Sequence, residues 1–230
     1  MNKLVVITGG TSGLGFEIAK QLSNWGEFDV CLIGKSKEKL NTALSHLPKS
    51  VFGFNGDVSN EEFVKNVFNT LAEKSYNIEY LFNCAGIGLF GDPDNNDATK
   101  TESIIKTNLI GTILTTNYAI PLMEKHGGKI VNILSTAALK GNPLESVYCA
   151  SKWGVRGFTE SLKEYFKQSK IKVVGVYPGG MNTDFWNNSR DYVSLERSSK
   201  FMNPADVANI IINNVTENSV SVADIVIERP

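Results

Sequence analysis

The sequence has few residues of the kinds that bind metal ions or crosslink a chain. It contains three cysteines and two histidines among 230 residues. Cys31, Cys84 and Cys149 lie far apart, and none has a second cysteine or a histidine at metal-ligand spacing. An odd number of scattered cysteines also argues against a disulfide framework and favours a reducing compartment. We therefore expect no metal site and a cytoplasmic protein.

Runs of one charge and long apolar stretches are also missing. The 23 basic and 24 acidic residues give a net charge of −1 and form no long block of one sign. This balance argues against nucleic acid or an anionic membrane as the main partner. No stretch approaches the roughly 18 consecutive apolar residues of a membrane span, and residues 3–7 predict a strand where a signal peptide would lie.

The sequence instead alternates short β-branched runs with longer helical patterns. Strands are predicted over 3–7, 29–33, 51–54, 79–82, 129–134, 172–176 and 224–228, and helices over 13–25, 37–46, 60–74, 99–125, 146–168 and 204–215. Several strand runs are continuously apolar, which is typical of strands buried on both faces of a parallel sheet. The pattern predicts one α/β domain over residues 1–230, a doubly wound Rossmann sheet of seven parallel strands with helices on both faces.

Two helix starts carry capping signals. Ser59 followed by Glu62 predicts a capping box before the third helix. Asn203 followed by Pro204 predicts an N-cap and a first helical residue for the last helix. Because doubly wound sheets bind ligands beyond the carboxyl ends of their strands, function is expected in the loops starting near residues 8, 34, 57, 83, 135 and 177.

The first of these loops is rich in glycine and opens a helix. It runs Thr8-Gly9-Gly10-Thr11-Ser12-Gly13-Leu14-Gly15 directly after an apolar strand. Glycine allows close backbone approach, and a helix N-terminus offers free amides to a pyrophosphate. No Lys-Ser or Lys-Thr pair follows, so a P-loop is not indicated. A dinucleotide site is favoured over a turn that only packs helix on strand, with Gly9, Thr11, Ser12, Gly13, Leu14 and Gly15 as cofactor-binding residues.

The end of the second predicted strand indicates which dinucleotide is bound. An acidic residue there usually accepts from the ribose 2′-hydroxyl of NAD, but this strand ends Gly34-Lys35-Ser36. Lys35 is predicted to pair with the 2′-phosphate of NADP, with Ser36 and Ser12 as further donors. The alternative is a solvated lysine at a helix start. Asp57, with Val58, either contacts adenine or caps the next helix.

Tyr148 and Lys152 form the candidate reactive pair. They stand at i and i+4 of a predicted helix, so they share one face. Free tyrosine titrates near pH 10, and a nearby ammonium is expected to lower its pKa. The phenol would then donate a proton to a carbonyl oxygen or accept one from an alcohol. An ordinary pair on a helix surface is the alternative.

Further polar residues lie in the same predicted region. Ser135 ends the fifth strand, where its hydroxyl could hold a substrate carbonyl. Asn83, Ala85 and Gly86 follow the fourth strand, where small residues let a cofactor pass. Asn108 interrupts a long helical pattern three residues before a glycine, which suggests a local distortion with a buried polar role. The segment from Tyr177 through Thr183 would close the other side of the site.

Taken in order, these motifs resemble the short-chain dehydrogenase/reductase family in its compact, single-domain branch. The resemblance spans Thr8 to Thr183 and includes Asn-x-Ala-Gly, Tyr-x-x-x-Lys and Pro-Gly-x-x-x-Thr. It implies that Tyr148 is the general acid–base and that Lys152 lowers its pKa and holds the nicotinamide ribose. It also implies that Ser135 orients the substrate oxygen, and that Asn108 supports a water in a relay to Lys152. Pro178, Gly179 and Thr183 would hold the carboxamide end of the cofactor.

Three departures from the family pattern stand out. Cys84 replaces the second asparagine of the usual Asn-Asn-Ala-Gly, which puts a sheet-stabilising contact in doubt. The predicted substrate lid, at about 184–202, is short. The sequence lacks the family's Asp-Gly-Gly tail, which often helps to build a tetramer interface. We expect a homodimer or a homotetramer.

The predicted function is NADPH-dependent reduction of a ketone or aldehyde, reversible as alcohol oxidation. An NAD-dependent alcohol dehydrogenase and a non-catalytic dinucleotide-binding redox sensor are the alternatives. The lid residues Phe185 and Trp186 favour a small apolar or aromatic substrate over a charged sugar, the alternative being that such side chains only pack the lid onto the sheet. The same holds for the other expected walls of the site, which are Leu89, Phe90, Ala137, Leu139, Leu144 and Tyr177.

Overall fold

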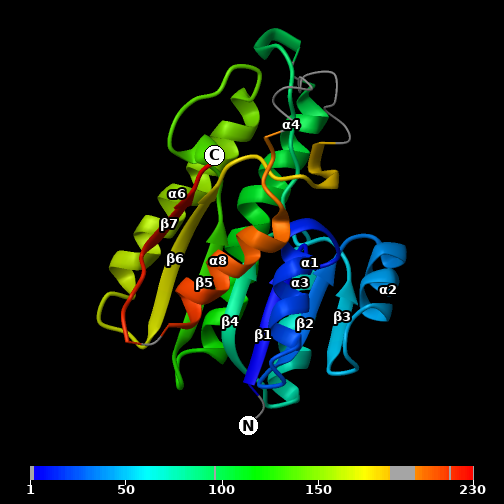
Figure 1. Cartoon of the computed structure of the whole chain (residues 1–230), viewed down its shortest axis with the longest axis vertical. Helices are drawn as coiled ribbons and strands as arrows, with labels where there is room; N and C mark the ends of the chain where they lie inside the picture. Colours follow the sequence, from blue (N-terminus) through cyan, green and yellow to red (C-terminus); the bar gives the residue numbers. More distant parts are fainter. Residues whose placement is uncertain (1–2, 96, 187–199, 218, 230) are drawn as a thin grey trace.

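The computed structural model describes residues 3–95, 97–186, 200–217 and 219–229 (Figure 1). All seven predicted strands form, within one or two residues of their expected ends, in one sheet. They are β1 (Lys3–Thr8), β2 (Asp29–Gly34), β3 (Val51–Asn55), β4 (Asn77–Asn83), β5 (Gly128–Ile133), β6 (Ile171–Pro178) and β7 (Asp224–Ile227). Their order in the sheet is β3-β2-β1-β4-β5-β6-β7 and every pair is parallel. The predicted doubly wound sheet is confirmed.

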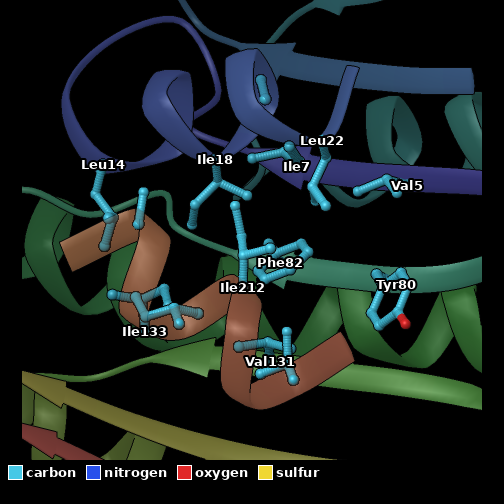
Figure 2. Close-up of a cluster of buried hydrophobic side chains, with 14 of the residues drawn as sticks. Val5, Ile7, Leu14, Ile18, Leu22, Tyr80, Phe82, Val131, Ile133 and Ile212 are labelled. Atoms are coloured by element: carbon cyan, nitrogen blue, oxygen red, sulfur yellow. The ribbon is translucent and has the colours of Figure 1, made fainter. Parts of the chain in front are cut away.

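Helices cover both faces of the sheet, which explains the continuous apolar runs. Val5 and Ile7 of β1 pack toward α1 (Gly13–Ser23), α2 (Lys37–Ser45) and α8 (Pro204–Thr216). Figure 2 shows this cluster, with Ile18 and Ile212 meeting over the sheet. Leu4 and Val6 face the opposite way, toward α3 (Glu61–Glu73), α5 (Gly111–Ala119) and α6 (Ser146–Tyr165). Since successive strand residues alternate faces, two buried faces require apolar residues at every position.

The strand order reverses direction between β1 and β4, and this point opens the ligand crevice. The chain moves outward from β1 to β2 and β3, then returns to place β4 on the other side of β1. The loops after β1 and β4 are tied together by Thr8, whose Oγ1 accepts from the amides of Cys84 and Ala85, each at 3.1 Å. Loops that leave a switch point on opposite faces leave a crevice between them.

The helix predicted over 99–125 is interrupted. It consists of α4 (Ala98–Ile105), a π-helical turn η2 (Lys106–Ile110), α5 and a 3-10 turn η3 (Ile120–Leu122). The distortion predicted around Asn108 is confirmed, since this residue lies in the middle of the π-turn and is 1% exposed. π-turns inside α-helices commonly mark functional sites, because they redirect a side chain out of the regular helical spacing.

One capping prediction is wrong and the other is confirmed. The third helix is capped by Asn60, whose side chain accepts from the Phe63 amide at 3.0 Å. Ser59 instead donates its amide and hydroxyl to Asp57 Oδ1, at 2.9 and 2.8 Å, so it is not available as a cap. Asn203 caps α8 as expected, accepting from the Ala205 amide at 2.9 Å.

No helix in the described ranges has both the length and the apolar character that crossing a bilayer would require. The predicted lid is described at 184–186 and 200–202, and residues 187–199 of that prediction lie outside the described residues.

Candidate active site

A cavity of about 1100 Å³ follows the carboxyl edge of the sheet. Loops after β1 to β6 line it, as the topology predicts. Most of the predicted site residues line this one cavity, namely Gly9, Thr11, Ser12, Gly13, Leu14, Gly15, Lys35, Ser36, Asp57, Val58, Ala85, Gly86, Ser135, Tyr148, Lys152, Pro178, Gly179 and Thr183. Two others within the described residues, Asn83 and Asn108, do not.

The glycine loop forms a cradle that side chains would fill. A Cβ on Gly15 would stand 2.5 Å from the carbonyl oxygen of Gly9, and one on Gly9 would stand 2.9 Å from Ala85 Cα. Gly13 has φ +54°, in the left-handed region, and a Cβ there would meet Thr183 Cγ2 at 3.2 Å. Ser12, just before α1, makes no side-chain capping hydrogen bond. Bare backbone, first-turn amides and a hydroxyl therefore face the cavity, which fits the pyrophosphate of a dinucleotide.

At the far end of the cavity, Lys35 and Asp57 form an ion pair. Lys35 Nζ lies 2.7 Å from Asp57 Oδ2, with side chains 76% and 28% exposed. Burial opposes ionisation of Asp57, but hydrogen bonds from Lys35 and Ser59 hold its pKa below the ordinary value. Asp57 is therefore not a helix cap, and Lys35 is not simply solvated. The sequence prediction missed Lys39, a second ammonium at this end, which lies 3.6 Å from Asp184.

Tyr148 and Lys152 lie at the other end of the cavity and are buried. Their exposed fractions are 8% and 5%, which excludes an ordinary surface pair. Lys152 Nζ lies 5.8 Å from the centroid of the Tyr148 ring and donates to the Ile133 carbonyl at 2.8 Å. The Tyr148 side chain hydrogen-bonds with Ser135. A phenol, an ammonium and a hydroxyl thus converge at the end of β5.

The pKa values of this group differ from the sequence prediction. Burial raises the pKa of Tyr148 above its ordinary value, the Ser135 hydrogen bond opposes this, and Glu145 and Cys149 add to it. The predicted lowering by Lys152 is therefore wrong for the protein alone, because desolvation of the phenolate is the larger effect. Burial also lowers the pKa of Lys152 to about 8. Tyr148 is a protonated donor throughout the neutral range.

Asn108 holds the surrounding elements together. Its Oδ1 accepts from the Ile87 amide at 2.8 Å, and its Nδ2 donates to the Ile87 carbonyl at 2.9 Å and to Ser151 Oγ at 3.0 Å. Ser151 in turn donates to the Tyr148 carbonyl at 2.7 Å. The side chain therefore joins the loop after β4 to the N-terminal half of α6. The water relay implied by the resemblance stays a prediction.

Asn83 and Cys84 lie behind the cavity wall and at its edge. Asn83 Nδ2 donates to Thr116 Oγ1 and Asn132 Oδ1, and its Oδ1 accepts from Thr115, all within 3.0 Å. Its side chain is 3% exposed and joins β4, β5 and α5. The prediction that this side chain binds the cofactor directly is therefore wrong. Cys84 lines the cavity, and its amide and that of Ala85 bond to Thr8.

Aromatic rings cover Tyr148. The ring centroids of Phe185 and Phe90 lie 5.6 and 6.0 Å from that of Tyr148, and Trp186 lies 4.9 Å from Phe90. Ala137, an expected wall, is buried against Tyr148. The expectation for Tyr177 is wrong, because it packs against Leu134, Ala138 and Val155 away from the cavity. Nor do the described side chains of Leu89, Leu139 and Leu144 line it, and Phe90 and Ala137 pack against Tyr148 without lining it.

Comparison with known proteins agrees with this geometry. The family model described as short chain dehydrogenase matches residues 3–193. Carbonyl reductase family member 4 of Danio rerio is 35% identical over 222 residues, covering 92% of this chain and 90% of that protein. The 3-oxoacyl-[acyl-carrier-protein] reductase of Homo sapiens is 34% identical over 83% of this chain and 81% of that protein. A solved actinorhodin polyketide ketoreductase with NADPH superposes with a TM-score of 0.89 at 25% identity, covering 99% and 95% of the two chains. The chain therefore belongs to the short-chain dehydrogenase family and is an NAD(P)-dependent oxidoreductase.

Proposed function

We propose that the protein is an NADPH-dependent reductase of ketones or aldehydes, with Tyr148 as proton donor. The observation that carries the proposal is the convergence of Tyr148, Ser135 and Lys152 at one end of a cavity of about 1100 Å³ that the glycine loop also lines. The nicotinamide supplies the hydride when it is bound, and the protein supplies position and electrostatics.

The chain's own groups account for the proton side of the reaction. Ser135 and Tyr148 both present a hydroxyl to the same point, so a carbonyl oxygen placed there accepts two hydrogen bonds. Because burial keeps Tyr148 protonated, it donates a proton to that oxygen. The Lys152 ammonium then stabilises the phenolate that remains. Phe185 and Phe90 keep water away from the ring and favour an apolar or aromatic substrate.

The names of the relatives support reduction as the direction. Both curated relatives described above are reductases, and the ketoreductase structure holds NADPH. We therefore propose NADPH over NADH for this chain. Lys35, Ser12 and Ser36 lie at the same end of the cavity, and the Lys35 side chain is exposed enough to turn from Asp57 toward a phosphate.

The experiment that tests the function is a substrate panel followed by absorbance at 340 nm. Aromatic and aliphatic ketones and aldehydes are offered with NADPH and, separately, with NADH. We expect turnover of aromatic carbonyl compounds with a higher kcat/KM for NADPH. A redox sensor would bind the dinucleotide and reduce none of them, and a higher kcat/KM for NADH would overturn the cofactor assignment.

Replacing Lys35 with alanine should change the cofactor preference. A lysine–phosphate hydrogen-bonded pair contributes about 1.5–3 kcal/mol, so kcat/KM for NADPH is expected to fall by about 10- to 100-fold. The value for NADH should stay within about twofold of the wild type, since NADH has no 2′-phosphate to lose. Lys37→Ala is the matched control, because Lys37 is an exposed lysine two residues away that does not line the cavity. Equal losses with NADPH and NADH would remove Lys35 from phosphate recognition.

We propose further that the enzyme acts in the cytoplasm as a homodimer or homotetramer. All three cysteines, each within the described residues, are free, which fits a reducing compartment. Large apolar side chains are exposed on adjoining elements, with Trp153 of α6 at 46% and Ile110 of η2 at 38%. Light scattering on the purified protein should give the mass of two or four chains, and a Trp153→Glu variant should shift it toward one.

A further inference from the structure

Lys39 and Asp184 form an ion pair on the wall of the same cavity. Lys39 lies in the first turn of α2 and Asp184 directly follows Thr183, so the pair joins two segments that are far apart in the sequence. Lys39 Nζ lies 3.6 Å from Asp184 Oδ2, and both residues line the cavity. Their side chains are 54% and 67% exposed, so both are free to reorient in solvent.

The glycine loop connects the same two segments by a second route. A Cβ on Gly34, at the end of β2, would overlap Thr11 Cγ2, so Thr11 packs against the strand that leads into α2. Two residues later, a Cβ on Gly13 would stand 3.2 Å from Cγ2 of Thr183, the residue before Asp184. The glycine loop and the ion pair therefore border the same stretch of the cavity.

Lys39 lies beside the donors expected for a 2′-phosphate. Ser12, Lys35 and Ser36 line the cavity at this end. Lys39 stands about one helical turn after Ser36, whose Oγ accepts from the Lys39 amide at 3.2 Å. The Lys39 ammonium is thus carried by the N-terminal turn of α2, where the helix itself favours a negative ligand.

The four charges at this end balance each other when both ion pairs are formed. Lys35 is paired with Asp57 at 2.7 Å, and Lys39 is paired with Asp184. A phosphate monoester carries about 1.5 to 2 negative charges near pH 7. Because both ammonium groups already have a carboxylate partner, binding of this phosphate requires that an ammonium group leave its carboxylate.

Of the two ammonium groups, Lys39 leaves its partner more easily. At 3.6 Å its contact with Asp184 is longer than a hydrogen bond, whereas Lys35 and Asp57 are within hydrogen-bond distance. Exposed ion pairs contribute little to stability, and Asp184 is exposed enough to be hydrated once Lys39 has left. A phosphate also offers Lys39 three acceptor oxygens and a larger charge than a carboxylate does.

We propose that Lys39 exchanges Asp184 for the 2′-phosphate of NADPH, so that these two residues help to set the cofactor preference. Lys39 then binds the phosphate beside Lys35, and Asp184 competes with the phosphate for the Lys39 ammonium. NADH has no phosphate at this position and leaves the pair intact. This inference rests on the proposed NADPH-dependent function and adds two cofactor-specificity residues to it.

Two nucleotides that differ only in the 2′-phosphate separate this exchange from catalysis. Dissociation constants of adenosine 2′,5′-bisphosphate and adenosine 5′-monophosphate are measured by isothermal titration calorimetry on the full chain, at low ionic strength because salt screens exposed charges. Lys39→Ala should weaken binding of the bisphosphate about 5- to 20-fold, and Asp184→Asn should strengthen it about two- to fivefold. The monophosphate should bind each variant within about 1.5-fold of the wild type, which also shows that the variant is folded.

The double variant Lys39→Ala/Asp184→Asn distinguishes exchange from simple repulsion. If Asp184 acts by holding Lys39, its replacement should change bisphosphate binding by less than about 1.5-fold once Lys39 is absent. Repulsion between Asp184 and the phosphate would act with or without Lys39. An equal gain from Asp184→Asn in both backgrounds, or no gain in either, would therefore overturn the exchange.

Lys37→Ala and Glu38→Gln are the matched controls. Both residues are exposed neighbours of Lys39 in α2, and neither lines the cavity. Both variants should bind the bisphosphate within about twofold of the wild type. A loss in Lys37→Ala as large as that in Lys39→Ala would show that only the overall charge of α2 matters, and it would contradict a specific role of Lys39.

Turnover in the substrate panel with NADPH is compared with these binding data. Bisphosphate binding that depends on Lys39 and Asp184 without any turnover would contradict the proposed reductase and leave the exchange intact. Turnover with NADPH, together with bisphosphate binding that Lys35→Ala weakens and Lys39→Ala does not, would leave the reductase intact and overturn the exchange. Equal binding of the two nucleotides by the wild type would overturn it as well.

Discussion

Replacing Tyr148 with phenylalanine is expected to lower kcat by about 10³-fold, within the range that general acid catalysis contributes. The change removes the phenolic hydroxyl and little else, because the ring keeps its contacts with Phe90 and Phe185. Binding of NADPH should persist, since in the proposed site the glycine loop and the loops after β2 and β6 would hold most of the cofactor. The measurements are stopped-flow absorbance at 340 nm for turnover and quenching of protein fluorescence for cofactor affinity.

Tyr165→Phe is the matched control for this experiment. Tyr165 is the last residue of α6 and is 81% exposed, so the loss of its hydroxyl should leave kcat unchanged. If Tyr148→Phe retained a rate within about tenfold of the wild type, Tyr148 would not be the proton donor. If it lost cofactor binding instead, its main role would be structural.

Replacing Lys152 with methionine should abolish most activity and at the same time stabilise the fold. Burial lowers the pKa of Lys152 from 10.5 to about 8, so holding it charged costs about 3 kcal/mol below pH 8. Methionine fills a similar volume without a charge, although it loses the hydrogen bond to the Ile133 carbonyl, which contributes about 1 kcal/mol. The net expectation is a gain in unfolding free energy of about 2 kcal/mol at pH 7, or a rise in Tm of roughly 4–8 °C.

The kcat of Lys152→Met should fall by about 10²-fold or more, because the phenolate left on Tyr148 loses its counter-charge.

The pH dependence of this stability difference gives the sharper test. Between pH 8 and 10.5 the unfolded wild-type chain binds more protons at Lys152 than the folded one, so wild-type stability from this group rises with pH. The advantage of Lys152→Met should therefore be largest below pH 8 and shrink toward pH 10.5. Lys167→Met changes a lysine that is 71% exposed and should show no such trend. A variant less stable than the wild type at every pH would show that Lys152 stabilises the fold.

The strands were predicted well because burial on both faces leaves little freedom in their sequence. Every residue from Leu4 to Ile7 is fully buried, so the apolar run and the strand coincide. The glycine loop was predictable for a similar reason, since the close approach of Gly15 to Gly9 admits no side chain. In both cases, burial or close backbone contact at a position restricts which residue types fit there, so the sequence itself records the constraint.

Features that depend on contacts between distant segments were not predictable. Asp57 both pairs with Lys35 from another loop and takes the hydroxyl of Ser59, which moves the helix cap to Asn60. The direction of the Tyr148 pKa shift depends on how deeply the ring is buried under Phe185, which spacing along α6 does not reveal.

The order of the strands also bears on how the protein can assemble during synthesis. β1, the first of the seven strands to leave the ribosome, ends up inside the sheet, with β2 and β3 added outward on one side and β4 to β7 added in turn on the other. Each new strand therefore pairs with one that has already emerged, and none has to insert between two finished neighbours. A nascent chain can bury its apolar strands one βαβ unit at a time. Among these paired edges, the longest wait falls on the edge of β1 that β4 joins, since residues 9–76 have to be made first.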